Sequence, residues 1–355
     1  MPRPAAHQPD LSERDREILK AVILTYVVEA EPVSSRSVSK RSGLGLSAAT
    51  IRNVMADLEE AGFLAQPHTS AGRVPTAAAY HLFIEQMMTS RRVPAKTRRL
   101  IEEHLLSGPG DADHLMEATS HLLSELSRQV GIVVTPAMGD TVLKAIDFVP
   151  LSGLKVLCVV VSTSGFVDNK VVEVDQPVSR ETLVWISNYI NDNFAGMTLS
   201  AIRDRLVAMM SEERAQVDRV LALTIELAKG GLDTAGGPKV LVEGASSVLV
   251  HPELSDIQRV RLLFDTFANQ ARLVSMLAQC IEGEGVRVMI GEESDLTSPL
   301  DFSLVVTRYG VGEKVLGTLG IFGPSRMEYD RVIPLVHYLG ETLSRALTGT
   351  EIRDR

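Results

Sequence analysis

The chain has 355 residues, of which 45% are hydrophobic and 23% are charged, an ordinary composition for a globular protein of two or three domains. No apolar run approaches the ~20 residues that a membrane-spanning helix needs, and the first ten residues lack the apolar core of a secretion signal. We therefore expect a cytoplasmic protein with a disordered tail at residues 1–10. Cys158 and Cys280 stand alone in apolar segments, which favours buried, reduced thiols.

Charge is divided unevenly along the chain. Although the net charge is −9, residues 1–99 contain 14 Lys and Arg against 10 Asp and Glu, whereas the remainder contains 22 against 35. The stretch between Glu31 and Asp57 has no acidic residue but four basic ones, Arg36, Lys40, Arg41 and Arg52. A basic end on an acidic body predicts a polyanionic partner at that end only.

Residues 11–90 carry the pattern of a helix-turn-helix. Ser12 with Asp15 resembles a capping box, and apolar residues then recur at helical spacing: Ile18, Leu19, Val22, Ile23, Tyr26 and Val27. Pro32 prevents this helix from continuing. Ser34 or Ser35 is expected to cap a second helix that turns Val38 inward, and the GLGL turn at 43–46 is expected to place Leu44 in the core.

Ser47 is the expected cap of a third helix. Its inner face would contain Ile51, Val54, Met55 and Leu58, and its outer face Ala49, Arg52, Asn53 and Ala56, with Thr50 on the flank. Small residues would let the outer face enter the major groove, where Arg and Asn bond to base edges. Ser47 and the N–H groups of the first turn could hold a phosphate. An exposed polar helix face without a function would have the same pattern, so this pattern alone does not show whether the helix binds DNA.

A wing is predicted after the third helix. Gly62 ends the helix, Phe63-Leu64 begins a strand, and Ser70-Ala71-Gly72 forms a turn with Arg73 at its tip. We expect Thr69, Ser70 and Arg73 to contact DNA, with Arg73 contributing to the salt dependence of binding. Pro75-Thr76 then introduces another helix, whose apolar stripe is Tyr80, Phe83, Ile84 and Met87. Helix, helix, turn, helix and hairpin in this order favour a DNA-binding winged helix.

Two segments resemble a known family. The run VSSRSVSKRSGLGLSAATIRNVMADLEEAGFLAQPHTSAGRVPT (33–76) and the run GTLGIFGPSRMEYDR (317–331) are similar to the signatures of the heat-inducible transcription repressors, the HrcA family. The resemblance covers essentially the whole chain. It departs where the family usually has a Lys-Gly-Tyr-Arg-like run after Pro-Thr, because here Ala78-Ala79-Tyr80-His81 stands, and His81 is not expected to supply the positive charge of an arginine.

This resemblance implies both architecture and function. It implies a GAF-like domain carrying an inserted dimerising domain, and a homodimer that represses chaperonin and chaperone operons by binding inverted-repeat operator DNA. It also implies that the GroEL chaperonin keeps the repressor active. From the residues themselves we expect no cofactor. The protein would lie in the bacterial cytoplasm, on the nucleoid when bound.

The rest of the chain is expected to alternate strands and helices. Residues 91–99 form a basic linker, either near DNA phosphates or simply solvated. Helices are predicted around Ile101–Leu106 and Leu115–Leu126, followed by four strands at 132–135, 142–148, 156–162 and 167–174. The continuous VLCVVVS run predicts a central strand buried on both faces. After three further helical patterns (from Arg180, Leu199 and Ser211 to Lys229) come a strand at 240–242, a long helix at 256–280, strands at 286–290, 303–307 and 315–321, and a final helix at 327–347.

We therefore predict an α+β multidomain protein: an N-terminal winged helix-turn-helix, then a GAF-like α/β domain interrupted by a mainly helical inserted dimerising domain. The boundaries are 11–90 for the head, 100–171 and 238–350 for the GAF-like domain, and 172–237 for the insertion. Apolar residues of the insertion could serve an internal core or a partner subunit: Leu183, Trp185, Ile186, Ile190, Val217, Val220, Leu221, Leu223 and Leu227. No convergent polar set specifies a ligand for the GAF-like domain.

Other functions are weaker on the sequence. No nucleophile with a base, paired-carboxylate motif or metal cluster supports an enzyme, and GGLDTAGGP at 230–238 lacks the Gly-Lys-Ser/Thr of a phosphate loop. An RNA-binding winged helix is allowed by the fold. The main alternative is a winged-helix regulator of other genes, controlled by a small ligand in the GAF-like domain.

Overall fold

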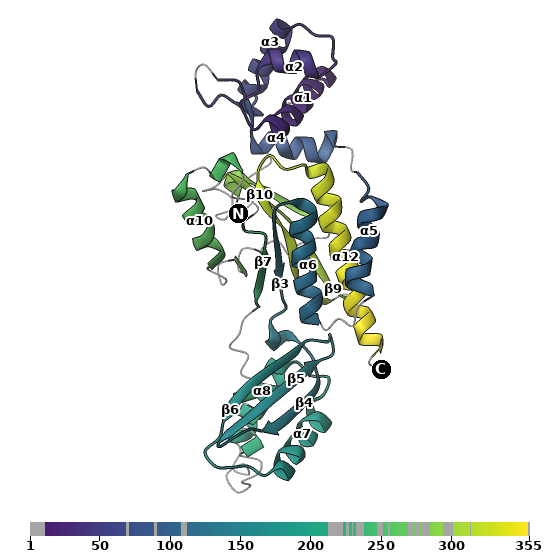
Figure 1. The fold of residues 1–355 in the computed structure, drawn as a ribbon, viewed down its shortest axis with the longest axis vertical. Helices are drawn as coiled ribbons and strands as arrows, with labels where there is room; N and C mark the ends of the chain where they lie inside the picture. The colour runs from purple at the N-terminus through teal and green to yellow at the C-terminus, as the bar shows by residue number, and fades with distance from the viewer. Residues whose placement is uncertain are drawn as a thin grey trace.

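The structure is a computed structural model of an α+β protein. It describes residues 11–68, 71–88, 91–107, 112–211, 238–246, 251–254, 256–268, 285–293, 301–312 and 314–353, with isolated residues at 223–224, 227–228, 230–231, 273–274 and 277. The chain forms three parts in a row: a helical head, a body built on a five-stranded sheet, and a smaller module at the far end (Figure 1).

The head has the predicted order of elements. Helices α1 (Glu13–Glu29), α2 (Ser35–Arg41) and α3 (Ala48–Glu60) precede a short antiparallel hairpin of β1 (Leu64–Ala65) and β2 (Val74–Pro75). Helix α4 (Ala77–Leu82) continues as the π-helical turn η1 (Phe83–Met87). The Ser12–Asp15 capping box is confirmed, and Ser34, rather than Ser35, caps α2.

The body is an antiparallel sheet in the order β7-β3-β10-β9-β8. These strands are β3 (Val130–Val134), β7 (Val240–Glu243), β8 (Arg287–Ile290), β9 (Phe302–Val311) and β10 (Lys314–Pro324). Helices α6 (Ala112–Ser127) and α12 (Tyr329–Arg353) cover one face with α5 (Ala95–Leu106) beside them, and α10 (Ile257–Ala268) covers the other face. Short helical turns η2 (Met138–Asp140), η5 (Pro252–Leu254) and η6 (Gly291–Glu293) connect elements.

Alternation along the body strands supplies two cores. In β9, Leu304 and Val306 face α10, whereas Val305 and Tyr309 face α12. The core beneath α12 continues without a break into the head, since it includes Ile18 and Tyr80. The head is therefore packed on the body and is not a separate unit on a tether.

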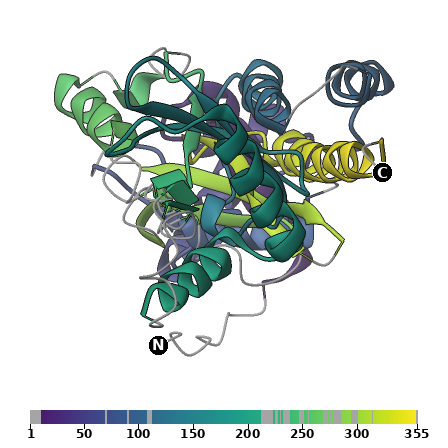
Figure 2. The ribbon, with the colours of Figure 1, turned by 90° about the horizontal axis from the view of Figure 1, so that it is seen from below.

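The module at the far end corrects the predicted insertion. Strands β4 (Leu143–Pro150), β5 (Lys155–Ser162) and β6 (Val167–Glu173), assigned from sequence to the GAF-like domain, form their own three-stranded sheet. Helices α7 (Arg180–Phe194) and α8 (Leu199–Ser211) share a separate core with this sheet. The inserted unit thus begins near residue 136 instead of 172, and among its described residues it is α/β, not mainly helical. Figure 2 views the molecule from this end.

The prediction for β5 was half right. It is the central strand of its sheet, but its residues alternate between buried and partly exposed because the helices of the module that the structure describes pack on one face of the sheet. A run of β-branched residues therefore did not indicate burial on both faces. Cys158 on this strand is buried, and burial raises the pKa of its thiol to about 12, so the thiol stays protonated.

Other predicted segments lie partly outside the described residues. These are most of the helical pattern at 211–229, the second half of the helix predicted at 256–280, and Cys280. In the insertion, Leu183, Ile186 and Ile190 belong to the internal core, whereas the Trp185 side chain is exposed. No helix in the described ranges has both the length and the apolar character to cross a membrane.

Candidate nucleic-acid interface

Helix α3 presents the outer face that its sequence predicts. Ile51, Val54, Met55 and Leu58 are buried against the head core, whereas Ala49, Arg52 and Asn53 are exposed. Thr50 and Ala56 are intermediate in exposure. Figure 1 places α3 at the end of the head that points away from the body. The body therefore does not cover this end of the head.

The start of α3 is fixed by its cap. The Ser47 hydroxyl accepts a hydrogen bond from the Thr50 N–H at 3.1 Å and lies 2.9 Å from the Thr50 hydroxyl. The first turn contains no acidic residue, so its exposed N–H groups meet no competing charge. This is a favourable site for a DNA phosphate.

The turn between α2 and α3 depends on glycine. Gly43 and Gly45 have φ angles of 65° and 67°, in the left-handed region that other residues rarely adopt. The Ser39 hydroxyl donates to the Leu46 carbonyl at 2.9 Å, which ties α2 to the residue just before the α3 cap. Leu44 packs against the core from a partly buried position, as predicted.

Basic residues of α2 border the same surface. Arg36 and Lys40 are exposed. Arg41 forms an ion pair with Glu29 at 2.8 Å, which neutralises part of its charge. In the described part of the chain, no hydrogen bond or ion pair ties the Arg36, Lys40, Arg52 or Asn53 side chain to another residue. These groups are available to an external partner.

The wing differs from the prediction at Arg73. This residue lies at the base of the hairpin, where its backbone pairs with that of Val33 through bonds of 2.8 and 2.9 Å. Its guanidinium donates to the Glu59 carboxylate at 2.6 and 2.9 Å, and its side chain is only 21% exposed. Arg73 thus fastens the wing to α3 and does not stand at the tip. This pair could not be predicted from the sequence, because Glu59 lies fourteen positions from Arg73.

The rest of the wing is shaped by neighbouring contacts. A side chain at position 72 would bring its Cβ within 2.4 Å of the Val33 carbonyl oxygen, so only glycine fits there. Gln66 donates from its amide to the Ala71 carbonyl at 3.0 Å, and His68 is exposed beside the turn. Sequence reasoning missed both residues. Thr69 and Ser70 lie outside the described residues.

The basic linker is shorter than predicted. Helix α5 begins at Ala95, so residues 95–99 belong to it. Arg91 is ion-paired with Asp330 of the body at 2.7 Å. His81, where the family pattern has arginine, also points to the body: its ring lies 2.7 Å from the Glu293 carboxylate, whose hydrogen bond raises the pKa of His81 although burial opposes it.

A hollow of about 750 Å³ lies on the body beside α5, α12 and β9. Arg98, Arg308 and Arg345 line it, but so do Glu102 and Glu341, and Glu102 accepts a 2.6 Å hydrogen bond from Tyr338. The hollow therefore has no single charge preference. Among the residues that the structure describes, no three His, Cys, Asp or Glu side chains are grouped so as to hold a metal ion.

Comparison with known families agrees with the geometry of the head. Residues 10–89 match the family described as "Winged helix-turn-helix transcription repressor, HrcA DNA-binding", and residues 113–333 match "HrcA protein C terminal domain". The chain belongs to the HrcA family of heat-inducible transcription repressors. Its head is the DNA-binding winged helix of this family, and the family is not enzymatic.

Full-length relatives share this organisation. The heat-inducible transcription repressor HrcA of Geobacter sulfurreducens is 40% identical over 340 residues, covering 96% of this chain and 99% of the relative. That of Syntrophobacter fumaroxidans is 36% identical over 343 residues, covering 95% and 98%. A crystal structure of a hypothetical protein has a TM-score of 0.66 and 24% identity, covering 96% of this chain and 99% of the other, and so shares its fold.

Proposed function

We propose that the chain represses chaperonin and chaperone operons as a homodimer bound to an inverted-repeat operator. The observation that carries this proposal is the exposed outer face of α3, with Arg52 and Asn53, in a member of the HrcA family. Arg52 reads guanine and Asn53 adenine in the major groove, and Ala49 allows close approach. Arg36, Lys40, Ser47 and Thr50 contact the backbone and fix the register. Repression follows because the bound dimer excludes polymerase from the promoter.

Exposed apolar side chains support dimerisation through the inserted module. Val184 and Trp185 on α7 are 47% and 48% exposed, and the Trp185 ring stacks on Tyr189 at 5.4 Å. Further exposed residues lie on its strands and on the turn between β4 and β5: Val149, Leu151, Leu154, Val167 and Val171. These residues lie on α7 and on the opposite side of the sheet; exposed apolar surface is typical of protein interfaces, and aromatic residues often dominate their binding energy. Two copies joined here would carry their heads at the outer ends.

Dependence on the GroEL chaperonin is part of the same proposal. Its support is the family resemblance together with apolar side chains exposed on the head and body, such as Val28 and Ile257, which are 75% and 82% exposed. A chaperonin that binds apolar surface would bind such a chain and release it in its active form. The repressor acts in the cytoplasm, where the chromosome lies.

Selection of bound sequences from random duplex DNA tests the proposal. Enrichment of an inverted repeat is expected, with half-sites one or more helical turns apart. Enrichment of a single asymmetric site would reject the dimeric reading, and no enrichment would reject operator binding. Replacing residues 136–238 by a short turn should give monomers with weak operator affinity. If this variant still sediments as a dimer, the contact between the two copies lies outside the inserted module.

A further inference from the structure

The second segment that resembles the family, residues 317–331, lies where the body meets the head. It forms most of β10, the turn after it and the first residues of α12. Most of its apolar side chains pack inside the body, but Arg326 reaches α1 and Tyr329 packs against Tyr80 of α4. The segment therefore has a structural partner that its sequence does not indicate.

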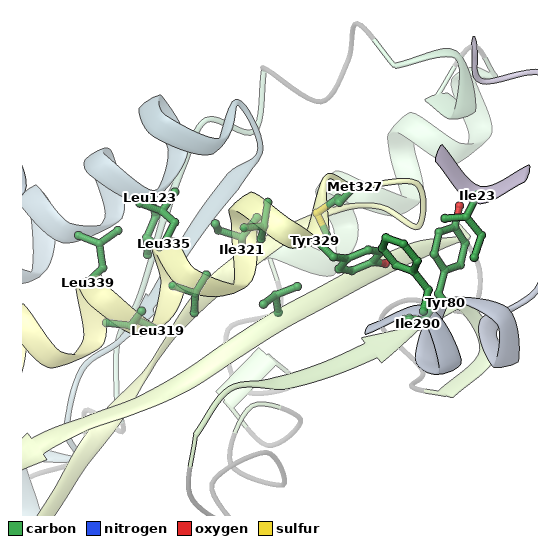
Figure 3. Packing of buried hydrophobic residues seen from close by; sticks show 14 of the residues in the cluster. Ile23, Tyr80, Leu123, Ile290, Leu319, Ile321, Met327, Tyr329, Leu335 and Leu339 are labelled. Atoms are coloured by element: carbon green, nitrogen blue, oxygen red, sulfur yellow. The ribbon is translucent and has the colours of Figure 1, made fainter. Parts of the chain in front are cut away.

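Two tyrosines join the cores of the head and body. The ring of Tyr80 on α4 lies 5.6 Å from the ring of Tyr329 at the start of α12, and both are almost completely buried. Figure 3 shows the two rings near each other, with Ile23 of the head and Ile290 of the body close by; their planes are tilted by 59°. The Tyr329 hydroxyl is held by the Ser303 hydroxyl and the Ser325 carbonyl, each at 2.8 Å. The body thus offers a fixed surface to the head.

A buried ion pair flanks the tyrosines. Arg326 donates to both carboxylate oxygens of Glu253, one of them at 3.2 Å, and the two side chains are only 13% and 16% exposed. Arg326 also reaches the Val27 carbonyl in the last turn of α1, at 3.5 Å. A cation at the carboxyl end of a helix is favourable. Because Glu253 holds the guanidinium of Arg326 in place, Arg326 in turn holds the carboxyl end of α1 in a fixed position relative to the body.

Two further ion pairs hold the head at other points. His81 on α4 meets Glu293 at 2.7 Å, and this carboxylate also accepts a hydrogen bond from the Ile290 N–H at 2.8 Å. Arg91, just after the head, meets Asp330 at 2.7 Å. The junction is therefore fastened at α1, at α4 and at the start of the linker. Fastening at three points resists rotation of the head as well as separation.

We propose that this junction sets the half-site spacing that the repressor accepts, with Arg326 as its main positioning residue. This inference rests on the proposed dimer and inverted-repeat operator. In such a dimer each recognition helix stands at the end of a long arm, because the head and the inserted module lie at opposite ends of the molecule (Figure 1). A small rotation at the junction moves α3 a long way along the DNA. A rigid junction therefore restricts binding to one spacing, and a loosened junction accepts several.

The test compares Arg326→Gln with Arg331→Gln. Arg331 is the matched control, since it lies in the same segment but, within the described part of the chain, its side chain pairs with Glu328 alone, and both side chains are more than half exposed. Affinity is measured for a duplex with one half-site and for inverted repeats whose spacer is lengthened or shortened by one base pair. We expect both variants to bind the single half-site within about twofold of the parent. The parent and Arg331→Gln should strongly prefer one spacing, and Arg326→Gln should lose at least two thirds of that preference.

Further variants keep the test decisive. Arg326→Lys keeps a cation beside the Val27 carbonyl and should keep more of the preference than Arg326→Gln, whereas a general loss of stability would affect both variants alike. If Arg326→Gln does not fold, His81→Ala loosens the junction from the α4 side. A folded variant that keeps the full spacing preference overturns the inference and leaves the dimer proposal standing. A parent without any preference for inverted repeats overturns both.

Discussion

Replacing Arg73 by alanine should destabilise the head without changing how DNA binding depends on salt. The guanidinium makes two hydrogen bonds to Glu59, and the side chains of the pair are 21% and 31% exposed. Exposed ion pairs contribute about 0–1 kcal/mol and hydrogen bonds to charged groups about 1.5–3 kcal/mol. A partly exposed pair should fall between these, at about 1–2 kcal/mol of unfolding free energy.

Thermal unfolding followed by circular dichroism measures this loss. A change of about 1–2 kcal/mol corresponds to about 2–8 °C in Tm for a cooperative unit of 150–250 residues. Glu59→Ala should give a similar shift, and the double variant should cost less than the sum, because each single change already breaks the pair. Glu60→Ala is the control, since Glu60 is the exposed neighbour without this contact.

The salt dependence of operator binding separates the two possible roles of Arg73. An arginine on a phosphate adds about one to the slope of log affinity against log salt concentration. We expect an unchanged slope. A slope that falls by about one, with unchanged Tm, would mean that Arg73 leaves Glu59 for DNA, and the reasoning from the ion pair would be refuted.

Three other predictions concern α3, the inserted module and the junction. Arg52→Ala should reduce discrimination against a substituted base by about 1–3 kcal/mol in competition binding, and an equal loss on all DNA would make Arg52 a phosphate contact. Trp185→Ala should raise the dimer dissociation constant at least tenfold in sedimentation, whereas Leu24→Ala, equally exposed on the head, should not. The His81–Glu293 pair should stabilise the protein most between about pH 4.5 and 6.5. The pKa of His81 is raised in the folded protein, so its contribution is lost as the pH rises through that raised pKa. The pKa of Glu293 is lowered, so its contribution is lost as the pH falls through that lowered pKa. His81→Ala should flatten the profile of unfolding free energy against pH, and an unchanged profile would exclude this pair as its source.

Local signals explain what the sequence could predict. Caps at Ser12, Ser34 and Ser47 and the apolar spacing of α1 and α3 act within a few residues, so they can be recognised without knowledge of the fold. The outward position of Arg52 and Asn53 follows from the same spacing. All strands predicted in the described ranges were found, with ends displaced by a few residues.

Partners distant in sequence explain what could not be predicted. Arg73 was placed at a tip because its pairing with Glu59 and Val33 depends on the folded hairpin. Strands β4 to β6 were assigned to the wrong sheet because periodicity indicates a strand and not its neighbour. Arg326 gave no sign that it contacts the head, since Val27 lies 299 positions earlier.

The position of the inserted module has a consequence for the order of folding. The module leaves and rejoins the body between β3 and β7, two adjacent antiparallel strands that pair Val134 with Val240. Closing a flexible loop of this length costs about 3 kcal/mol more than closing a turn of roughly five residues. If the module folds first, however, its two ends already lie together, as the 2.9 Å bond from the Thr135 N–H to the Lys239 carbonyl indicates. The inserted module should therefore fold before β7 joins the edge of the body sheet. During synthesis β3 then stays unpaired with β7 until that strand, about a hundred residues later, has been made.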